Sequence, residues 1–122
     1  MKRILLVDDE EETRNVFDAA LKSGGYEVVV AGSGKETLDL VKTQQFDLVL
    51  LDQMMPDMSG NDTLKAIKAD PATANLHISM LTNFSHDDMI KEALNLGASE
   101  YILKYQVSAE DLLKRVKQIL GD

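Results

Sequence analysis

The stretch VLLDQMMPDMSG, residues 49–60, places an aspartate directly after a run of apolar residues. The apolar run has the pattern of a strand that is covered on both faces, as in a parallel sheet. Asp52 follows at once, and a carboxylate at the edge of an apolar core costs free energy unless something offsets its charge. Pro56 and the Ser-Gly pair then mark a loop. The stretch therefore predicts a buried strand with an acid at its carboxyl end.

The composition is that of one ordinary globular domain. The chain has 122 residues, of which 44% are apolar, so we expect residues 1–122 to form a single domain with one core. There is no cysteine, which excludes disulfides, zinc–thiolate sites and iron–sulfur clusters. No apolar run is long enough for a membrane span or a signal peptide, so we expect a cytoplasmic protein without membrane contact. The net charge of −8 disfavours direct binding to nucleic acid.

Five short β-rich runs alternate with five segments of helical spacing. The runs are Arg3–Val7, Glu27–Val30, Asp47–Leu51, His77–Leu81 and Glu100–Leu103. After each run, apolar residues recur at intervals of three and four, which is typical of an amphipathic helix. Parallel strands are joined by right-handed crossovers through helices. The order therefore predicts an α/β fold of the (βα)5 type, a doubly wound five-stranded parallel sheet with helices on both faces.

Four serines mark the expected starts of the last four helices. They are Ser33, Ser59, Ser85 and Ser108, and each is followed three residues later by an acid, as in a capping box. The segment Gly32-Ser-Gly-Lys35 also looks like part of a phosphate-binding loop. The full motif needs a glycine at position 29 and a serine or threonine at position 36, where the chain has Val29 and Glu36. We therefore reject nucleotide binding at this loop.

The residues that follow the strands suggest a phosphoryl-transfer site. Ligands of open α/β sheets bind outside the carboxyl ends of the strands. The residues there are Asp8, Asp9 and Glu10 after the first strand, Asp52 after the third, Thr82 after the fourth and Lys104 after the fifth. Clustered carboxylates favour a hard divalent cation such as Mg²⁺. Asp52 could then act as a nucleophile toward phosphorus, while the lysine and the hydroxyl hold phosphoryl oxygens.

As a set, Asp8-Asp9, Asp52, Thr82 and Lys104 resemble the site of the response-regulator receiver domain of two-component signalling, over essentially the whole chain. The resemblance implies the CheY-like, flavodoxin-like fold with strand order 2-1-3-4-5. It implies that Asp52 accepts a phosphoryl group from the phosphohistidine of a histidine kinase or of a phosphotransfer protein. It also implies Mg²⁺ as the cofactor.

The resemblance assigns the metal ligands residue by residue. Asp9 and Asp52 would bind Mg²⁺ directly. Met54 would bind it through its backbone carbonyl, and Asp8 would bind it through water. Taken alone, Asp8-Asp9 could simply cap the first helix, since acids favour helix N-termini.

The resemblance also implies a conformational switch. Thr82 and Lys104 would contact phosphoryl oxygens, and Tyr101 matches the aromatic residue that turns inward when Thr82 moves toward the phosphoryl group. The surface read by a downstream protein would be the fourth helix, the fifth strand and the fifth helix. The domain would be a monomer or a phosphorylation-dependent dimer, either free-standing or part of a longer regulator.

Four positions depart from the family pattern or tune it. The family usually follows its lysine with a proline in a cis peptide, but Tyr105 follows Lys104. Either the fold imposes a costly non-proline cis peptide or the loop runs differently. Asn83 stands where the family has a small residue, and it could crowd the phosphoryl group or hydrogen-bond to it. Met54 and Phe84 occupy the two positions that tune the lifetime of the phosphoryl group. Neither can orient a water molecule, so we expect slow self-dephosphorylation.

Three functions are weighed. The leading one is a phosphoryl-accepting switch that binds partners and is not a turnover enzyme. The second is a receiver-like scaffold that is never phosphorylated, which Asn83 and Tyr105 leave open. The third is an aspartate-nucleophile phosphatase, which is disfavoured because many such enzymes carry an aspartate two residues after the nucleophile, where this chain has Met54.

Overall fold

The computed structural model describes residues 1–122, and strands and helices alternate along the chain. The strands are β1 (Arg3–Val7), β2 (Glu27–Ala31), β3 (Leu48–Leu51), β4 (Ile78–Thr82) and β5 (Glu100–Leu103). The helices are α1 (Glu11–Ser23), α2 (Gly34–Thr43), α3 (Gly60–Ala69), α4 (Asp87–Leu96) and α5 (Ala109–Leu120), with a short 3-10 turn, η1 (Lys104–Gln106), before α5. Each predicted strand is present, and its ends agree within one residue.

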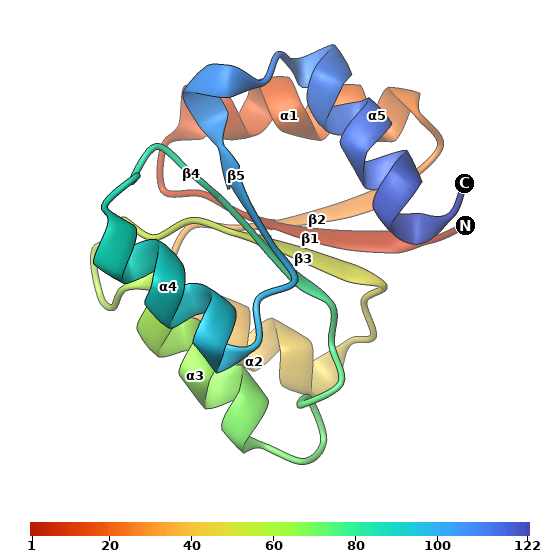
Figure 1. Ribbon diagram of the computed structural model, residues 1–122. Coiled ribbons are helices and arrows are strands. Elements are labelled where there is room, and N and C mark those ends of the chain that lie inside the picture. Colours follow the sequence, from red (N-terminus) through yellow and green to blue (C-terminus); the bar gives the residue numbers. More distant parts are fainter.

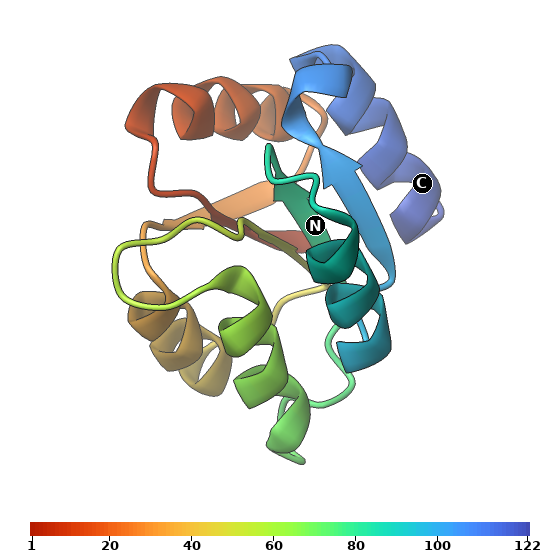
Figure 2. The same cartoon turned by 60° about the vertical axis from the view of Figure 1, so that its left-hand side comes forward.

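The five strands form one parallel sheet in the order β2-β1-β3-β4-β5, which confirms the predicted fold. Helices α1 and α5 cover one face of the sheet, and α2, α3 and α4 cover the other (Figure 1). The turned view in Figure 2 shows α3 and α4 lying side by side on their face. The carboxyl ends of β1, β3, β4 and β5 consequently meet at one edge of the sheet.

The core consists of two apolar layers, one on each face of the sheet. Along β1, Leu5 and Val7 belong to the layer under α2–α4, and Ile4 and Leu6 belong to the layer under α1 and α5. All of β3 is buried. The continuously apolar run Val28–Val30 predicts that β2, like β1 and β3, is covered on both faces. This prediction is wrong, because β2 is an edge strand and Val30 is 39% exposed. None of the helices combines the length and hydropathy that a bilayer crossing requires.

Three of the four expected serine caps are present. The side chains of Ser33, Ser59 and Ser108 each accept a hydrogen bond from the backbone N–H three residues later, and Ser108 forms a complete capping box with Asp111. The expected cap at Ser85 is wrong. Helix α4 begins one residue later than that cap would require, after His86, and no side chain caps it. Two acids in its first turn, Asp87 and Asp88, favour the positive end of the helix dipole instead.

The loop that resembles a phosphate-binding motif is already occupied by a side chain of the same chain. Asp57, from the β3–α3 loop, accepts hydrogen bonds from the backbone N–H groups of Gly34 (2.9 Å) and Lys35 (2.8 Å) at the start of α2. These hydrogen bonds lower the pKa of the Asp57 carboxyl, and the bond from Gly34 has the larger effect. The N–H groups that a nucleotide phosphate would use therefore bind an internal carboxylate, which is a physical reason to reject nucleotide binding there.

Candidate functional site

Lys104 joins the acids that end two different strands. Its Nζ lies 2.7 Å from Asp8 Oδ2 and 2.8 Å from Asp52 Oδ2. All three residues are buried, with 7%, 1% and 3% of their surface exposed. A single ammonium group is therefore shared by two buried carboxylates that are 44 positions apart in the sequence (52 − 8). This contact answers why a carboxylate can follow the buried strand β3.

Burial and charge act against each other in this ion triad. Burial raises the pKa of Asp8, while the hydrogen bonds from Lys104 and from the Glu10 backbone N–H oppose that rise. Burial works to lower the pKa of Lys104, but its contacts with Asp52 and Asp8 outweigh burial and raise that pKa. Lys104 is therefore held as a cation beside an acid that would ionise less readily without it.

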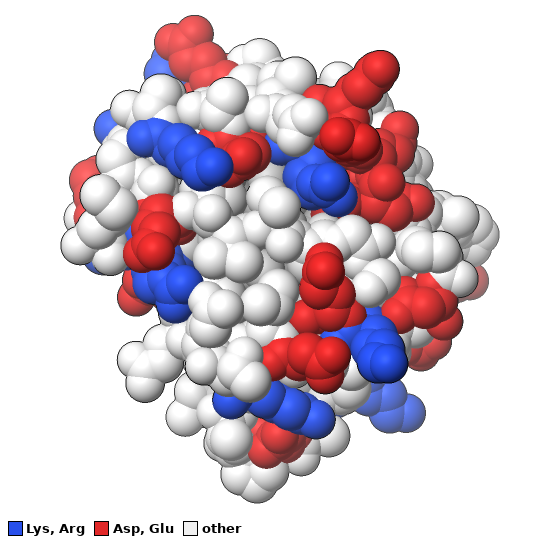
Figure 3. Space-filling view, turned by 180° about the vertical axis from the view of Figure 1, so that it is seen from behind, with Lys and Arg blue, Asp and Glu red and all other residues white.

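The turn after β1 presents hard oxygen ligands. One carboxylate oxygen from each of Asp8, Asp9 and Glu10 lies within 4.8 Å of the others, and Asp9 and Glu10 are exposed. Acidic side chains gather where α1 begins (Figure 3). Oxygen ligands at a half-open turn suit Mg²⁺, which keeps several waters and uses few protein carboxylates. The sequence places Glu10 at the end of the first strand but does not predict it as a metal ligand. Its position directly after Asp8-Asp9 is the only sequence signal for that role.

Asp52 itself keeps one oxygen free of strong contacts. Its Oδ2 accepts the ammonium hydrogen bond from Lys104, whereas its Oδ1 accepts only a long hydrogen bond from the Met54 backbone N–H, at 3.4 Å. The Met54 side chain is 60% exposed. Asp52 is thus held firmly at one oxygen, while its second oxygen has only one long hydrogen bond.

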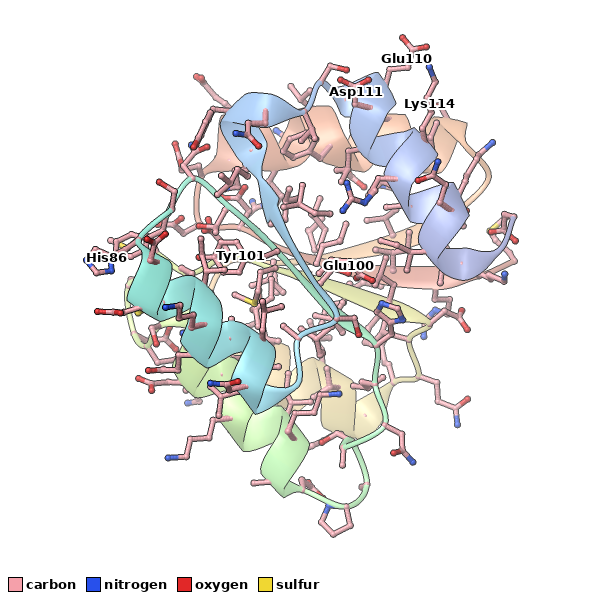
Figure 4. All side chains as sticks on the ribbon, in the orientation of Figure 1. His86, Glu100, Tyr101, Glu110, Asp111 and Lys114 are labelled. Carbon is pink, nitrogen blue, oxygen red and sulfur yellow. The ribbon has the colours of Figure 1, made fainter.

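Thr82 and Tyr101 both bind the same loop residue. The Oγ1 of Thr82, which is fully buried, accepts hydrogen bonds from the backbone N–H of Phe84 (3.2 Å) and from that of Gln53 (3.5 Å). The Tyr101 hydroxyl donates to the Phe84 carbonyl at 2.7 Å. Its side chain lies on the side of β5 that faces α4 (Figure 4). Burial raises the pKa of Tyr101, so the hydroxyl stays a donor at neutral pH.

The loop after Lys104 has no strained cis peptide and instead runs differently from the usual family pattern. The chain has no cis peptide bond, and Lys104 begins the 3-10 turn η1. Lys104 still reaches both acids, so the missing proline does not displace its ammonium group. Tyr105 is 64% exposed beside it. Asn83 is also exposed and makes no side-chain hydrogen bond across the site.

Two buried amides next to the site were not predicted from the sequence. Gln53 directly follows Asp52, Asn61 lies in the first turn of α3, and each is 1% exposed. The Gln53 side chain donates to Asn61 Oδ1 at 2.6 Å and accepts from the Asn61 backbone N–H at 2.8 Å. The one signal in the sequence is the polar residue Gln53 between the buried strand and the loop, which by itself does not indicate a buried amide pair.

Comparison with known proteins agrees with this geometry. A model of the response regulator receiver domain matches residues 4–117. The chain belongs to this family. Its receiver fold is similar to the crystal structure of a CheY-like response regulator receiver domain protein from Methanospirillum hungatei, with a TM-score of 0.92 and 32% identity over 99% of this chain and 94% of that one.

Among curated proteins, the receiver is similar to parts of longer regulators. It is 35% identical to the phosphate regulon transcriptional regulatory protein PhoB of Pseudomonas aeruginosa, over 98% of this chain and 52% of that protein. It is 38% identical to the transcriptional regulatory protein CpxR of Escherichia coli, over 98% of this chain and 50% of that protein. The chain thus spans about half the length of these relatives. Because they are named as transcriptional regulators, the expectation of no nucleic-acid contact stays a prediction.

Proposed function

We propose that this receiver accepts a phosphoryl group on Asp52 from a phosphohistidine and uses the modification to change its partner-binding surface. The observation that carries the proposal is the triad of Lys104, Asp8 and Asp52. A buried ammonium that holds one oxygen of a carboxylate, while the other oxygen has only a long backbone hydrogen bond, suits an acceptor of a charged group. The gathering of these groups at the carboxyl edge of the sheet supports the same function.

The transfer step is a substitution at phosphorus. Asp52 Oδ1 attacks the phosphorus atom, a phosphorus–oxygen bond forms, and the phosphorus–nitrogen bond to the donor histidine breaks. The electron pair of the broken bond stays on the imidazole nitrogen of the donor. Lys104 is placed to move from the carboxylate oxygen toward a phosphoryl oxygen, which offsets the added negative charge. Thr82, whose Oγ1 accepts a hydrogen bond from the Gln53 backbone N–H next to Asp52, would donate its hydroxyl to another phosphoryl oxygen.

The residues present fit a magnesium site. Asp9 and Glu10 offer exposed carboxylate oxygens next to the buried carboxylate of Asp8, and oxygen donors of this kind suit Mg²⁺. When bound there, Mg²⁺ would supply positive charge beside the incoming phosphoryl group. Within this proposal, Asp9 is the direct ligand and Asp8 acts through water. The ligand roles of Asp52 and of the Met54 carbonyl stay predictions.

The partners follow from this chemistry. The phosphoryl donor is a histidine kinase or a phosphotransfer protein, and the downstream partner binds the face formed by α4, β5 and α5. Such donors are charged from ATP, so we place the domain in the cytoplasm. The domain acts as a switch that is modified once per signal, and we propose no turnover of a separate substrate.

Intact mass spectrometry tests the proposal. Acetyl phosphate with MgCl₂ should add one phosphoryl group to the wild type, and none when EDTA replaces the metal. Asp52→Asn should abolish the gain. The matched control is Asp47→Asn, which changes an exposed acid at the opposite end of the same strand, and it should keep the gain. A wild type that gains no mass would instead support the unphosphorylated scaffold.

Magnesium binding can be measured without phosphorylation. Calorimetric titration of the unmodified protein with MgCl₂ should show binding that Asp9→Asn weakens by about tenfold or more, which corresponds to about 1.4 kcal/mol. The variant Asp87→Asn changes an exposed acid at the start of α4 and should bind as the wild type does. Equal binding by the Asp9 variant would remove Asp9 from the metal site.

A further inference from the structure

The side chains of Gln53 and Asn61, here called the amide bridge, form a buried polar link in an otherwise apolar layer. The Gln53 amide donates to Asn61 Oδ1 at 2.6 Å and accepts from the Asn61 backbone N–H at 2.8 Å, which leaves the Asn61 side-chain NH2 group to bind elsewhere. Each residue is 1% exposed. Buried amides hold their geometry, because an unpaired one is costly in a low-dielectric environment.

The amide bridge ends on α4. The Asn61 side-chain amide donates to the Met89 backbone carbonyl at 3.2 Å and to the Glu92 carboxylate at 3.3 Å. Met89 and Glu92 lie on consecutive turns of α4. A buried group on α3 therefore fixes the first two turns of α4 by hydrogen bonds, in addition to apolar packing.

The other end of the amide bridge is the peptide that follows Asp52. The Gln53 backbone N–H donates to Thr82 Oγ1, and the Gln53 carbonyl accepts from the Gly60 backbone N–H at 2.9 Å. Gly60 is pressed against the same peptide, because a Cβ on it would lie 2.2 Å from the Asp52 carbonyl oxygen. The start of α3 thus follows any movement of the peptide between Asp52 and Gln53.

We propose that the amide bridge couples the phosphorylation state of Asp52 to the position of α4. This inference rests on the proposed function. In the unmodified domain, Thr82 Oγ1 is the acceptor for the N–H groups of Gln53 and Phe84. When Thr82 turns to the phosphoryl group, the Gln53 N–H loses that acceptor and its peptide is free to shift. The amide bridge carries the shift to the Asn61–Met89 bond, which weakens and releases α4.

This route is separate from the one through Tyr101. Tyr101 binds the Phe84 carbonyl, which lies in the loop before α4. The amide bridge reaches the helix itself, at Met89 and Glu92. The link through Tyr101 and the link through the amide bridge both depend on where the Thr82 hydroxyl lies. A change at Thr82 therefore acts on the loop before α4 and on α4 itself at once, which favours a two-state movement of the helix.

Hydrogen–deuterium exchange of the α4 amides, residues 87–96, tests the amide bridge. The test variant is the double substitution Gln53→Met with Asn61→Leu, which roughly keeps side-chain volume and removes both side-chain amides together, so that only the backbone N–H of residue 61 loses its acceptor. In the unmodified protein, α4 should exchange at least about fivefold faster than in the wild type, the lower end of ordinary coupling between sites. Phosphorylation with acetyl phosphate and MgCl₂ should then change α4 exchange much less than in the wild type.

Two further variants serve as a control for surface substitution on α4 and as a milder test of the same contact. Asn95→Leu makes the same substitution on the exposed side of α4 and should exchange as the wild type does. Glu92→Ala removes one acceptor from an exposed position, so folding is not at risk, and should give a smaller rise in the same direction. If both the double variant and Glu92→Ala match Asn95→Leu, the amide bridge does not hold α4.

The two proposals fail in different ways. A wild type that takes up no phosphoryl group, seen by intact mass, would refute phosphorylation at Asp52 and with it the coupling. A phosphorylated double variant whose α4 exchange changes as much as that of the wild type would refute the coupling alone. Phosphorylation at Asp52 would then stand.

Discussion

Replacing Lys104 by methionine removes the charge that balances two buried acids. The Lys104 side chain is 5% exposed, and its carboxylate partners on Asp8 and Asp52 are 1% and 4% exposed. Removing one partner of a buried ion pair costs about 3–5 kcal/mol, because the remaining charge is left without compensation. Each acid keeps one backbone hydrogen bond, from Glu10 and Met54 respectively, so we expect about 4 kcal/mol. That is a large part of the stability of an ordinary domain.

The stability lost in Lys104→Met should depend on pH, and the direction of that dependence follows from the pKa of Asp8. Burial raises the pKa of Asp8, and losing Lys104 raises it further. The folded variant then binds a proton more tightly than the unfolded chain, so its stability increases as pH falls through the raised pKa. The raised pKa of Lys104 contributes stability that is fully present below the ordinary lysine pKa of 10.5 and is lost only above it, so it adds no pH dependence between about pH 4.5 and about pH 7. The gap between the two proteins should therefore be widest near neutral pH and narrower in acid.

Urea denaturation at about pH 7 and about pH 4.5 measures the gap. We expect about 4 kcal/mol at the higher pH and clearly less at the lower one. The control is Lys114→Met, an exposed lysine on α5 that is labelled in Figure 4, whose loss should change stability by less than about 0.5 kcal/mol. A Lys104 variant that loses under about 1 kcal/mol, or loses the same at both pH values, would refute the balance described here.

Three further predictions concern the cap of α5, the close approach at Gly60 and the lifetime of the phosphoryl group. Ser108→Ala should cost about 1 kcal/mol in urea denaturation because it removes the capping box of α5, and Ser85→Ala should cost almost nothing. Gly60→Ala should cost about 1–3 kcal/mol, because its Cβ would meet the backbone of Asp52 at 2.2 Å. Met54→Asn should speed the decay of the acyl phosphate by about tenfold, because a new side-chain hydrogen bond can orient the attacking water.

Each of these has an outcome that would contradict it. Equal losses for the two serine variants would mean that the Ser108 hydroxyl does not cap α5. Gly32→Ala is the control for Gly60, because its Cβ would lie 3.3 Å from the Arg14 guanidinium and no nearer than 4.0 Å to any backbone atom, and matching losses would contradict the close approach. Decay rates are compared after removal of the phosphodonor. If neither Met54→Asn nor Phe84→Tyr changes the rate, these positions do not set the lifetime.

The sheet was predictable because its signals are local and repeated. The continuous apolar runs of β1 and β3 require cover on both faces, and that requirement, with the alternating helices, leaves few topologies. The failure at β2 has a physical reason. Val28 to Val30 look as buried as β1, but the pattern does not tell an edge strand from a central one. The cap at Ser85 failed because a capping motif gives no information on where the preceding loop ends.

The candidate site was predictable as a set of residues but not as a set of contacts. Asp8, Asp52 and Lys104 follow from the rule that strand ends converge, whereas the sharing of one ammonium by two acids needed coordinates. The sequence left two courses for the chain after Lys104, a cis peptide or a different loop, and only the structure shows the 3-10 turn η1 there. Gln53 and Asn61 were missed because two polar residues eight positions apart show no pattern until a loop folds back and pairs them.

The most direct test of the account is to locate the phosphoryl group on the chain. The protein is treated with acetyl phosphate and MgCl₂, the acyl phosphate is reduced with borohydride, and the digested peptides are sequenced by mass spectrometry. We predict reduction at Asp52 alone, dependent on magnesium and absent from Asp52→Asn. Reduction at another carboxylate, or at none in a protein that binds magnesium, would contradict Asp52 as the phosphoryl acceptor.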